Sequence, residues 1–366
     1  MPKHYLVTGG SGFIGAALVR RLVRDGHRVR VLDDNSRGNP RRLGDVAGSV
    51  EFVTGDIRDA AAVAKAVRGV DGVLHLAAVN GTRHFYEKPE VVLDVGVRGM
   101  LNVLDACRSE GVGDLVLASS SEAYQTPPVV PTPEDIPLVV PDVLNPRYSY
   151  GGSKLISELL AVNWGRTGFD RVAIFRPHNV YGADMGWEHV VPEFVRRAVA
   201  AIDLTPRGPV PFLIQGDGTQ TRAFVHIDDA VDGIVAVIER GEHLGIYHVG
   251  NPEEVAIADL ARQVVARLAE MARQVGLVPR QDVDREALRP GEGREARALL
   301  LRRPQDERRI ERHRGEGIHR HAHQRAVVAR GDHGDAGPEL AEAAPVGLHV
   351  LAGMVALDGH TVRHGC

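Results

Sequence analysis

Two groups of residues in this 366-residue chain have types and spacings that could do chemistry. The first is the run TGGSGFIG, which places Gly9, Gly12 and Gly15 where a predicted strand passes into a helix. Phe13 and Ile14 begin the apolar face of that helix. Small residues let the backbone approach a pyrophosphate closely and aim the N–H groups of the helix N-terminus at it. The run therefore predicts a phosphate-binding turn.

Acidic residues follow the next two predicted strands. Asp33 ends the second strand, about 18 residues after the glycine run, which is the spacing of a dinucleotide-binding fingerprint. A carboxylate there accepts hydrogen bonds from the adenosine ribose and repels a 2′-phosphate, so it favours NAD over NADP, although the basic Arg37 nearby points the other way. Asp56 and Ile57 follow the third strand, where they could hold an adenine edge.

The second group is Tyr150 and Lys154, four residues apart on a predicted helix and therefore on one face of it. A phenol has a pKa near 10 and is a poor base at neutral pH. A nearby ammonium group and a positively charged nicotinamide would both favour the phenolate. We therefore predict Tyr150 as a general base for a hydroxyl group, with Lys154 as its partner and as a ligand of the nicotinamide ribose.

Short β-branched runs alternate with longer helical patterns up to about residue 265, which predicts βαβ units and a doubly wound, Rossmann-type parallel sheet covered on both faces. The expected strands are 4–8, 28–32, 51–54, 72–75, 114–118 and 171–175, and the longer expected helices are 13–24, 89–109 and 150–166. We assign residues 1–175 to the dinucleotide-binding domain. Residues 176–296 form a smaller substrate-binding part with segments that return to the sheet, and 297–366 form an atypical tail.

Composition excludes several classes of protein. The 44 basic and 48 acidic residues give a formal charge of -4, so no overall positive field exists to attract nucleic acid or a lipid surface. No apolar run approaches the ~18 residues that span a bilayer. The two cysteines, Cys107 and Cys366, form neither a disulfide framework nor a metal site. We expect a cytoplasmic protein without metal, nucleic-acid or membrane partners.

Several motifs, taken in order, resemble those of the extended short-chain dehydrogenase/reductases, and more narrowly their nucleotide-sugar epimerase and dehydratase branch. They are TGGSGFIG, GDIRD, HLAA, SSSEAY, YGGSK and RPGEG, and the resemblance runs from residue 3 to about 295. It implies NAD as cofactor, a nucleotide sugar as substrate, and a homodimer formed by the helices 89–109 and 150–166. It also places Ala77 of HLAA at the cofactor.

The resemblance assigns further residues to the site. Ser120 would share the proton of the substrate hydroxyl with Tyr150, and Asn179, Arg222 and Arg289 would contact the nucleotide diphosphate. Glu122 bears on the reaction type, because the 4,6-dehydratases carry Thr-Asp-Glu where this chain reads Ser-Ser-Glu, and decarboxylases acting on UDP-glucuronate also pair Ser with Glu here. In addition, Gln125 stands where the family usually has glycine.

Three functions follow. The leading hypothesis is an NAD-dependent nucleotide-sugar epimerase that oxidises C4 transiently to a 4-keto sugar. The alternative is a 4,6-dehydratase or a decarboxylase of the UDP-glucuronate type in which Glu122 assists, and a second alternative is an NAD-binding protein without catalysis.

The tail differs in composition from the rest of the chain. It is rich in Arg, His, Gly and Ala, and no aromatic residue follows Tyr247. We interpret it either as a solvated, disordered segment or as the product of a frameshift near Arg297, which resequencing of the DNA would test. His319, His321 and His323 have no acidic or cysteine partners at ligand spacing, so we predict no metal there.

Overall fold

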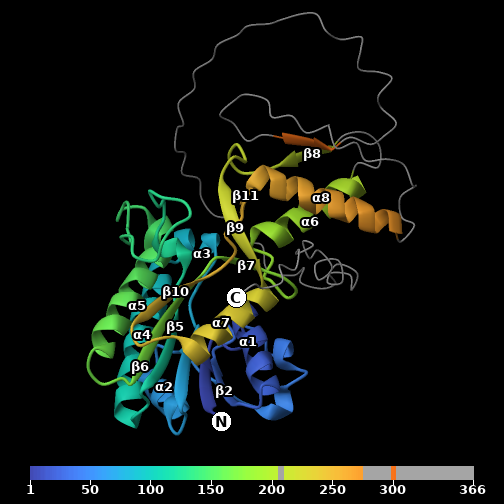
Figure 1. The fold of residues 1–366 in the computed structure, drawn as a ribbon. Coiled ribbons are helices and arrows are strands. Elements are labelled where there is room, and N and C mark those ends of the chain that lie inside the picture. Colours follow the sequence, from blue (N-terminus) through green and yellow to red (C-terminus); the bar gives the residue numbers. More distant parts are fainter. Residues whose placement is uncertain (205–209, 275–297, 302–366) are drawn as a thin grey trace, which may run out of the picture.

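The larger sheet has seven strands, all parallel, in the order β10-β6-β5-β4-β1-β2-β3 (Figure 1). The computed structural model describes residues 1–204, 210–274 and 298–301. The strands are β1 His4–Thr8, β2 Arg28–Asp33, β3 Val50–Thr54, β4 Gly72–His75, β5 Asp114–Ala118, β6 Arg171–Pro177 and β10 Gly245–Val249. The strand order runs outward from β1 in both directions, so the carboxyl ends of β1 and β4 border a natural crevice.

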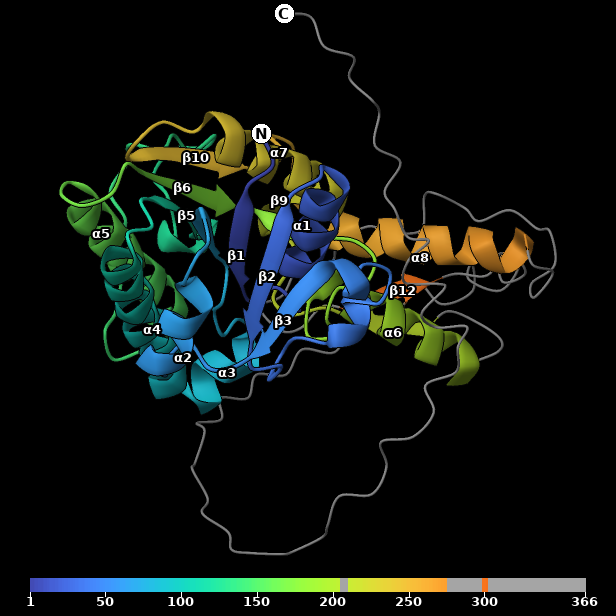
Figure 2. The same ribbon diagram turned by 90° about the horizontal axis from the view of Figure 1, so that it is seen from below.

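Helices cover both faces of this sheet (Figure 2). On one face, α1 (Phe13–Arg24) and α7 (Ile227–Arg240) contribute Leu18 and Ile234 to a buried cluster with the sheet. On the other, α2 (Ala60–Val67), α4 (Pro89–Glu110) and α5 (Ser149–Gly165) pack around Met100, Leu104 and Ala161. The predicted doubly wound parallel sheet is confirmed, because all six expected strands are present within two residues of their expected ends.

The seventh strand, β10, is missing from the sequence prediction. It pairs in parallel with β6 at the edge of the sheet, and only its last residue, Val249, is fully buried. A half-exposed edge strand lacks the continuous apolar run by which the central strands are recognised.

The smaller part of the molecule is built from two short sheets and two helices, above the large sheet in Figure 1. β7 (Asn179–Tyr181), β9 (Thr221–His226) and β11 (Glu254–Ala256) form one sheet, and β8 (Val210–Leu213) pairs with β12 (Ala298–Leu301). Helices α6 (Val190–Leu204) and α8 (Ile257–Gln274) enclose a separate core that includes Phe194, Phe212 and Leu260. α7 packs against the large sheet and β10 pairs with β6 at its edge, although both follow residue 176 in the chain.

Several expectations concern residues at the C-terminal end. β12 lies within the segment expected to be irregular. Arg289 and the remainder of the tail, with its three histidines and the frameshift hypothesis, lie outside the described residues. Across the ranges that the structure describes, no helix is long and apolar enough to cross a membrane. The same ranges contain no group of three metal-binding side chains.

Candidate active site

The glycine run forms a tight turn between β1 and α1. Gly9 has a φ of +72°, and a Cβ atom on it would lie 2.8 Å from the Ala77 backbone. A Cβ on Gly15 would lie 2.1 Å from the Gly9 carbonyl oxygen. Gly12 is the N-cap of α1 and has no side chain to occupy the helix N-terminus. These contacts require glycine and leave the N–H groups of the helix end accessible to an anion.

A cleft opens beside this turn, at the carboxyl ends of the strands. The residues that the sequence analysis placed at the cofactor line it together: Gly9, Asp33, Asp56, Ile57 and Ala77. Gly12 and Gly15 shape the turn behind it, whereas Phe13 and Ile14 pack against the hydrophobic core.

Asp33 is held rigidly at one end of the cleft. Its carboxylate accepts hydrogen bonds from the backbone N–H of Ser11 at 2.9 Å and of Asn35 at 2.9 Å, and the side chain is buried. The carboxylate thus ties the phosphate turn to the end of β2.

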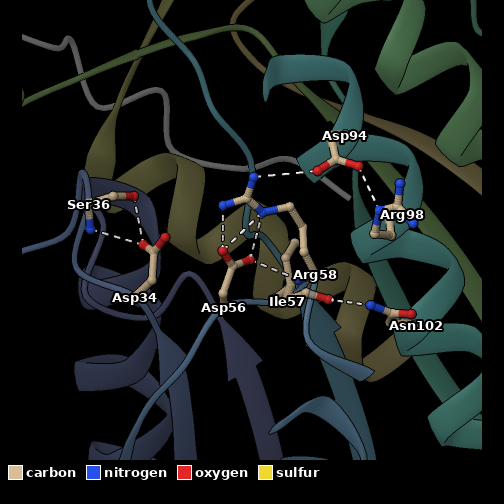
Figure 3. A network of polar contacts seen from close by, with 8 residues as sticks. All are labelled: Asp34, Ser36, Asp56, Ile57, Arg58, Asp94, Arg98 and Asn102. Carbon is tan, nitrogen blue, oxygen red and sulfur yellow. Dashed lines mark hydrogen bonds and ion pairs between the residues drawn. The ribbon is translucent and has the colours of Figure 1, made fainter. Parts of the chain in front are cut away.

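An ion-pair network borders the cleft beyond β3 (Figure 3). Asp56 accepts hydrogen bonds from the Arg58 guanidinium at 2.9 and 2.6 Å, and Arg58 also reaches Asp94 of α4 at 3.4 Å. These bonds to Arg58 lower the pKa of the Asp56 carboxyl. Asn102 donates to the Ile57 carbonyl oxygen at 2.9 Å. Asp56 and Ile57 are therefore fixed in place by α4 before any ligand binds.

His75, at the end of β4, has a defined protonation state. The Thr8 hydroxyl oxygen accepts the N–H groups of Leu76 and Ala77 at 3.2 Å each, so its own proton points to His75 Nδ1 at 2.7 Å. Nδ1 must therefore accept, which requires the neutral ring. Burial, with the Lys154 charge, lowers the pKa of His75 to about 3. His75 belongs to the HLAA motif, but the sequence carries no signal that the Thr8 hydroxyl connects its ring to the Ala77 N–H.

Tyr150 and Lys154 lie on one face of α5 in a fully buried site. The Tyr150 ring stacks on Phe85 with 5.2 Å between ring centres, and its hydroxyl lies near the Ser120 side chain. Lys154 Nζ lies 5.8 Å from the centre of the Tyr150 ring and donates to the Ala118 carbonyl oxygen at 2.7 Å. The structure thus brings Ser120, Tyr150 and Lys154 together, and their catalytic roles stay a prediction.

Burial shifts the pKa of both Tyr150 and Lys154. It raises the pKa of Tyr150 to about 12, while the nearby Ser120 side chain opposes this shift. Burial lowers the pKa of Lys154 to about 8, while the Glu158 charge opposes that shift. Lys154 is therefore charged at neutral pH, and Tyr150 keeps its proton in the structure.

Glu122 lies beside this site in an ion pair that the sequence did not predict. Its carboxylate accepts hydrogen bonds from Arg147 Nη2 at 3.0 and 3.2 Å, and the Arg147 guanidinium lies 5.3 Å from the centre of the Phe85 ring. Arg147 comes from a Pro-rich loop whose sequence carries no signal for this contact. Gln125 has a φ of +57°, a conformation that glycine adopts easily, which explains the glycine usual in similar proteins at this position.

A buried ion pair joins α5, the helix that carries Tyr150 and Lys154, to β6. Glu158, one turn beyond Lys154, binds Arg176 of β6 through two hydrogen bonds of 2.9 and 2.6 Å, and both side chains are at most 5% exposed. Ser119 also donates to Glu158, and Arg176 donates to the Tyr124 hydroxyl. The pair locks α5 to β5 and β6 next to Ser120.

The predicted substrate residues lie in the smaller sheet. Asn179 begins β7 and donates to the Ala223 carbonyl oxygen at 2.9 Å. Arg222, on β9, is exposed and donates to the carbonyl oxygen of Thr221 at 2.7 Å. Asn179 and Arg222 thus lie on neighbouring strands, and their contact with a diphosphate stays a prediction.

The chain has a Rossmann-type fold in which Ser120, Tyr150 and Lys154 lie together. The chain belongs to the NAD dependent epimerase/dehydratase family, whose sequence model matches residues 5–250.

Known relatives of this chain act on nucleotide sugars in different ways. UDP-N-acetyl-alpha-D-glucosaminuronate decarboxylase of Bacillus cytotoxicus is 31% identical over 288 residues, which cover 77% of this chain and 85% of that protein. A putative UDP-glucose 4-epimerase of Methanocaldococcus jannaschii is 33% identical over 261 residues, covering 70% and 79%. A double mutant of dTDP-glucose 4,6-dehydratase from Streptomyces venezuelae, solved with NAD, has a TM-score of 0.65 at 33% identity and covers 72% and 81%.

Proposed function

We propose that this protein is an NAD-dependent nucleotide-sugar epimerase that oxidises the sugar at C4 to a 4-keto intermediate and reduces it again on the opposite face. The observation that carries the proposal is the buried contact of Ser120 with Tyr150, with the Lys154 ammonium on the same helix face. That set is suited to remove a proton from a hydroxyl group and to return it.

The cleft fits a dinucleotide. The glycine turn accommodates a pyrophosphate because side chains at Gly9 or Gly15 would collide with the backbone. Asp33 would receive the adenosine ribose, and Asp56 with Ile57 the adenine. When bound, NAD would supply the hydride acceptor and donor and, in its oxidised form, a positive charge.

The chain's own groups then move one proton. Tyr150 accepts the proton of the C4 hydroxyl, while Ser120 orients the hydroxyl and the Lys154 charge stabilises the phenolate. Because the pKa of free Tyr150 is raised to about 12 by burial, this step depends on positive charge gathered around the ring. On reduction the same phenol returns the proton to the C4 oxygen.

Glu122 favours epimerisation over dehydration. A dehydratase needs an acid that protonates the departing hydroxyl, but the Glu122 carboxylate already accepts two hydrogen bonds from Arg147. The neighbouring position holds Ser121, which is no acid at all. Decarboxylation needs no such acid, and the similarity to a decarboxylase of Bacillus cytotoxicus supports it as the second candidate.

We also propose a homodimer formed through α4 and α5. These helices pack side by side, and their outer surface exposes Leu93, Ile156 and Leu159 by 38%, 36% and 56%. Apolar side chains grouped on two adjacent helices suit burial against a second copy of the same surface.

The test is the product of the reaction. The purified protein is incubated with NAD and a panel of UDP-, dTDP-, GDP- and CDP-sugars, and products are analysed by mass spectrometry and NMR. Epimerisation gives an isomer of unchanged mass, and Glu122→Gln retains activity. Loss of carbon dioxide would replace the proposal by decarboxylation, and loss of water would show that Glu122 acts as an acid despite its pairing with Arg147.

A further inference from the structure

Arg37 lines the dinucleotide cleft beside the carboxylates Asp33, Asp34 and Asp56. It lies on the loop that follows β2, at the end of the cleft where the adenosine ribose would bind. A guanidinium at this place attracts a 2′-phosphate, whereas Asp33 repels one. The choice between NAD and NADP therefore depends on which partner engages Arg37.

The partner of Arg37 comes from the other half of the molecule. Arg37 Nη1 donates to Glu188 Oε2 at 3.2 Å, and Glu188 belongs to the segment between β7 and α6. Arg37 Nη1 also lies 3.3 Å from the ring nitrogens of His84. Burial and the Arg37 charge lower the pKa of His84, so the imidazole adds no positive charge at neutral pH.

Two further contacts fix Glu188 at the cleft. Arg42 donates to the Ser11 carbonyl oxygen at 3.2 Å and to the Asp184 carbonyl oxygen at 3.0 Å, which joins the phosphate turn to the segment that carries Glu188. Gly81 lies against the pair with a φ of +124°, and a Cβ there would be 3.3 Å from both Arg37 Nη2 and Glu188 Oε2.

We propose that Glu188, acting through Arg37, makes the cleft select a dinucleotide without a 2′-phosphate. Glu188 neutralises Arg37 and holds its guanidinium, so Asp33 and Asp34 set the charge at the ribose. Because Glu188 lies in the smaller part, this residue extends the specificity determinant beyond the Rossmann domain. The inference rests on the dinucleotide cleft and is independent of which sugar reaction the protein performs.

The experiment measures binding of NAD and NADP to the full-length protein by isothermal titration calorimetry, after removal of bound dinucleotide. The wild type binds NAD more tightly than NADP. In Glu188→Gln the affinity for NADP rises about tenfold, the effect of one charge-assisted hydrogen bond, and the affinity for NAD does not change. In the double variant with Arg37→Gln this gain disappears. Asp232→Asn, which removes a carboxylate from the Arg21 pair and does not line the cleft, changes neither affinity.

Several results would overturn the proposal. An equal change for both dinucleotides in Glu188→Gln would make Glu188 a tether between the two halves and not a selector. A gain that persists without Arg37 would show direct repulsion by Glu188. Unchanged affinities in Glu188→Gln, or a wild type that binds neither dinucleotide, would also refute it. A chain that binds NAD but turns over no sugar would contradict only the proposed function.

Discussion

Acid should destabilise this protein through His75, and replacing that residue should remove a predictable part of the effect. The folded pKa of His75 is about 3 because of burial and the Lys154 charge, against about 6.5 in the unfolded chain. Between those values the unfolded state binds more protons, so the free energy of unfolding falls as the pH falls. From pH 7 to pH 5 this one group should account for a loss of about 2 kcal/mol.

His75→Asn is the appropriate variant, because its amide oxygen can accept the Thr8 hydroxyl in place of Nδ1. Urea unfolding at pH 7 and pH 5 gives the change in free energy for each protein. Other histidines and the carboxylates contribute to both proteins and cancel in the comparison. We expect the variant to lose about 2 kcal/mol less than the wild type over this range. Losses that agree within about 0.5 kcal/mol would refute the assignment of a buried, neutral His75.

Three other variants test the remaining parts of the site. Tyr150→Phe keeps the ring but removes the hydroxyl, so turnover should fall by about 10²- to 10⁴-fold while NAD binding in calorimetry stays unchanged. A smaller loss of turnover would exclude Tyr150 as the base. Glu158→Gln should lower the free energy of unfolding, measured with urea, by about 3–5 kcal/mol, because it leaves the buried Arg176 guanidinium without a counter-charge. The control is Glu87→Gln, which removes an exposed ion pair with Arg83 and should leave the urea midpoint unchanged. Leu159→Arg should halve the mass measured by sedimentation equilibrium. The control is Leu213→Arg on β8, where the leucine is as exposed as Leu159, and it should leave that mass unchanged. A wild-type monomer would contradict the proposed dimer.

The sequence predicts the parts of this molecule in which local pattern and topology agree. The buried central strands and the glycine turn are recognisable because each needs particular residues at fixed spacing, and the ends of parallel strands necessarily meet at one edge of the sheet. This is why Gly9, Asp33 and Asp56 could be assigned to one cleft, whereas Ala77 is assigned to it only through the resemblance of HLAA to a family motif. The partners of Glu122 and Arg37 could not be assigned. Arg147 lies in a one-turn 3-10 helix (Pro146–Tyr148) and Glu188 in the segment between β7 and α6; the contacts of both follow from tertiary packing and leave no periodic signal.

The sequence also does not show how deeply Tyr150 and Lys154 are buried, and burial changes the pKa of both groups. Spacing alone suggests that the ammonium lowers the pKa of the phenol. In the structure, burial raises the pKa of Tyr150 to about 12 and lowers that of Lys154 to about 8, so each shift opposes the charged form of its own group.

Two features preserve the positive charge on which the phenolate depends. Glu158 raises the pKa of Lys154, and His75, whose pKa is lowered to about 3, adds no positive charge beside the ammonium. The remaining gap in pKa must be closed by charge that arrives with the ligands. In the proposed reaction the base is protonated at rest and would be generated only when the dinucleotide and the sugar hydroxyl are both bound at Tyr150.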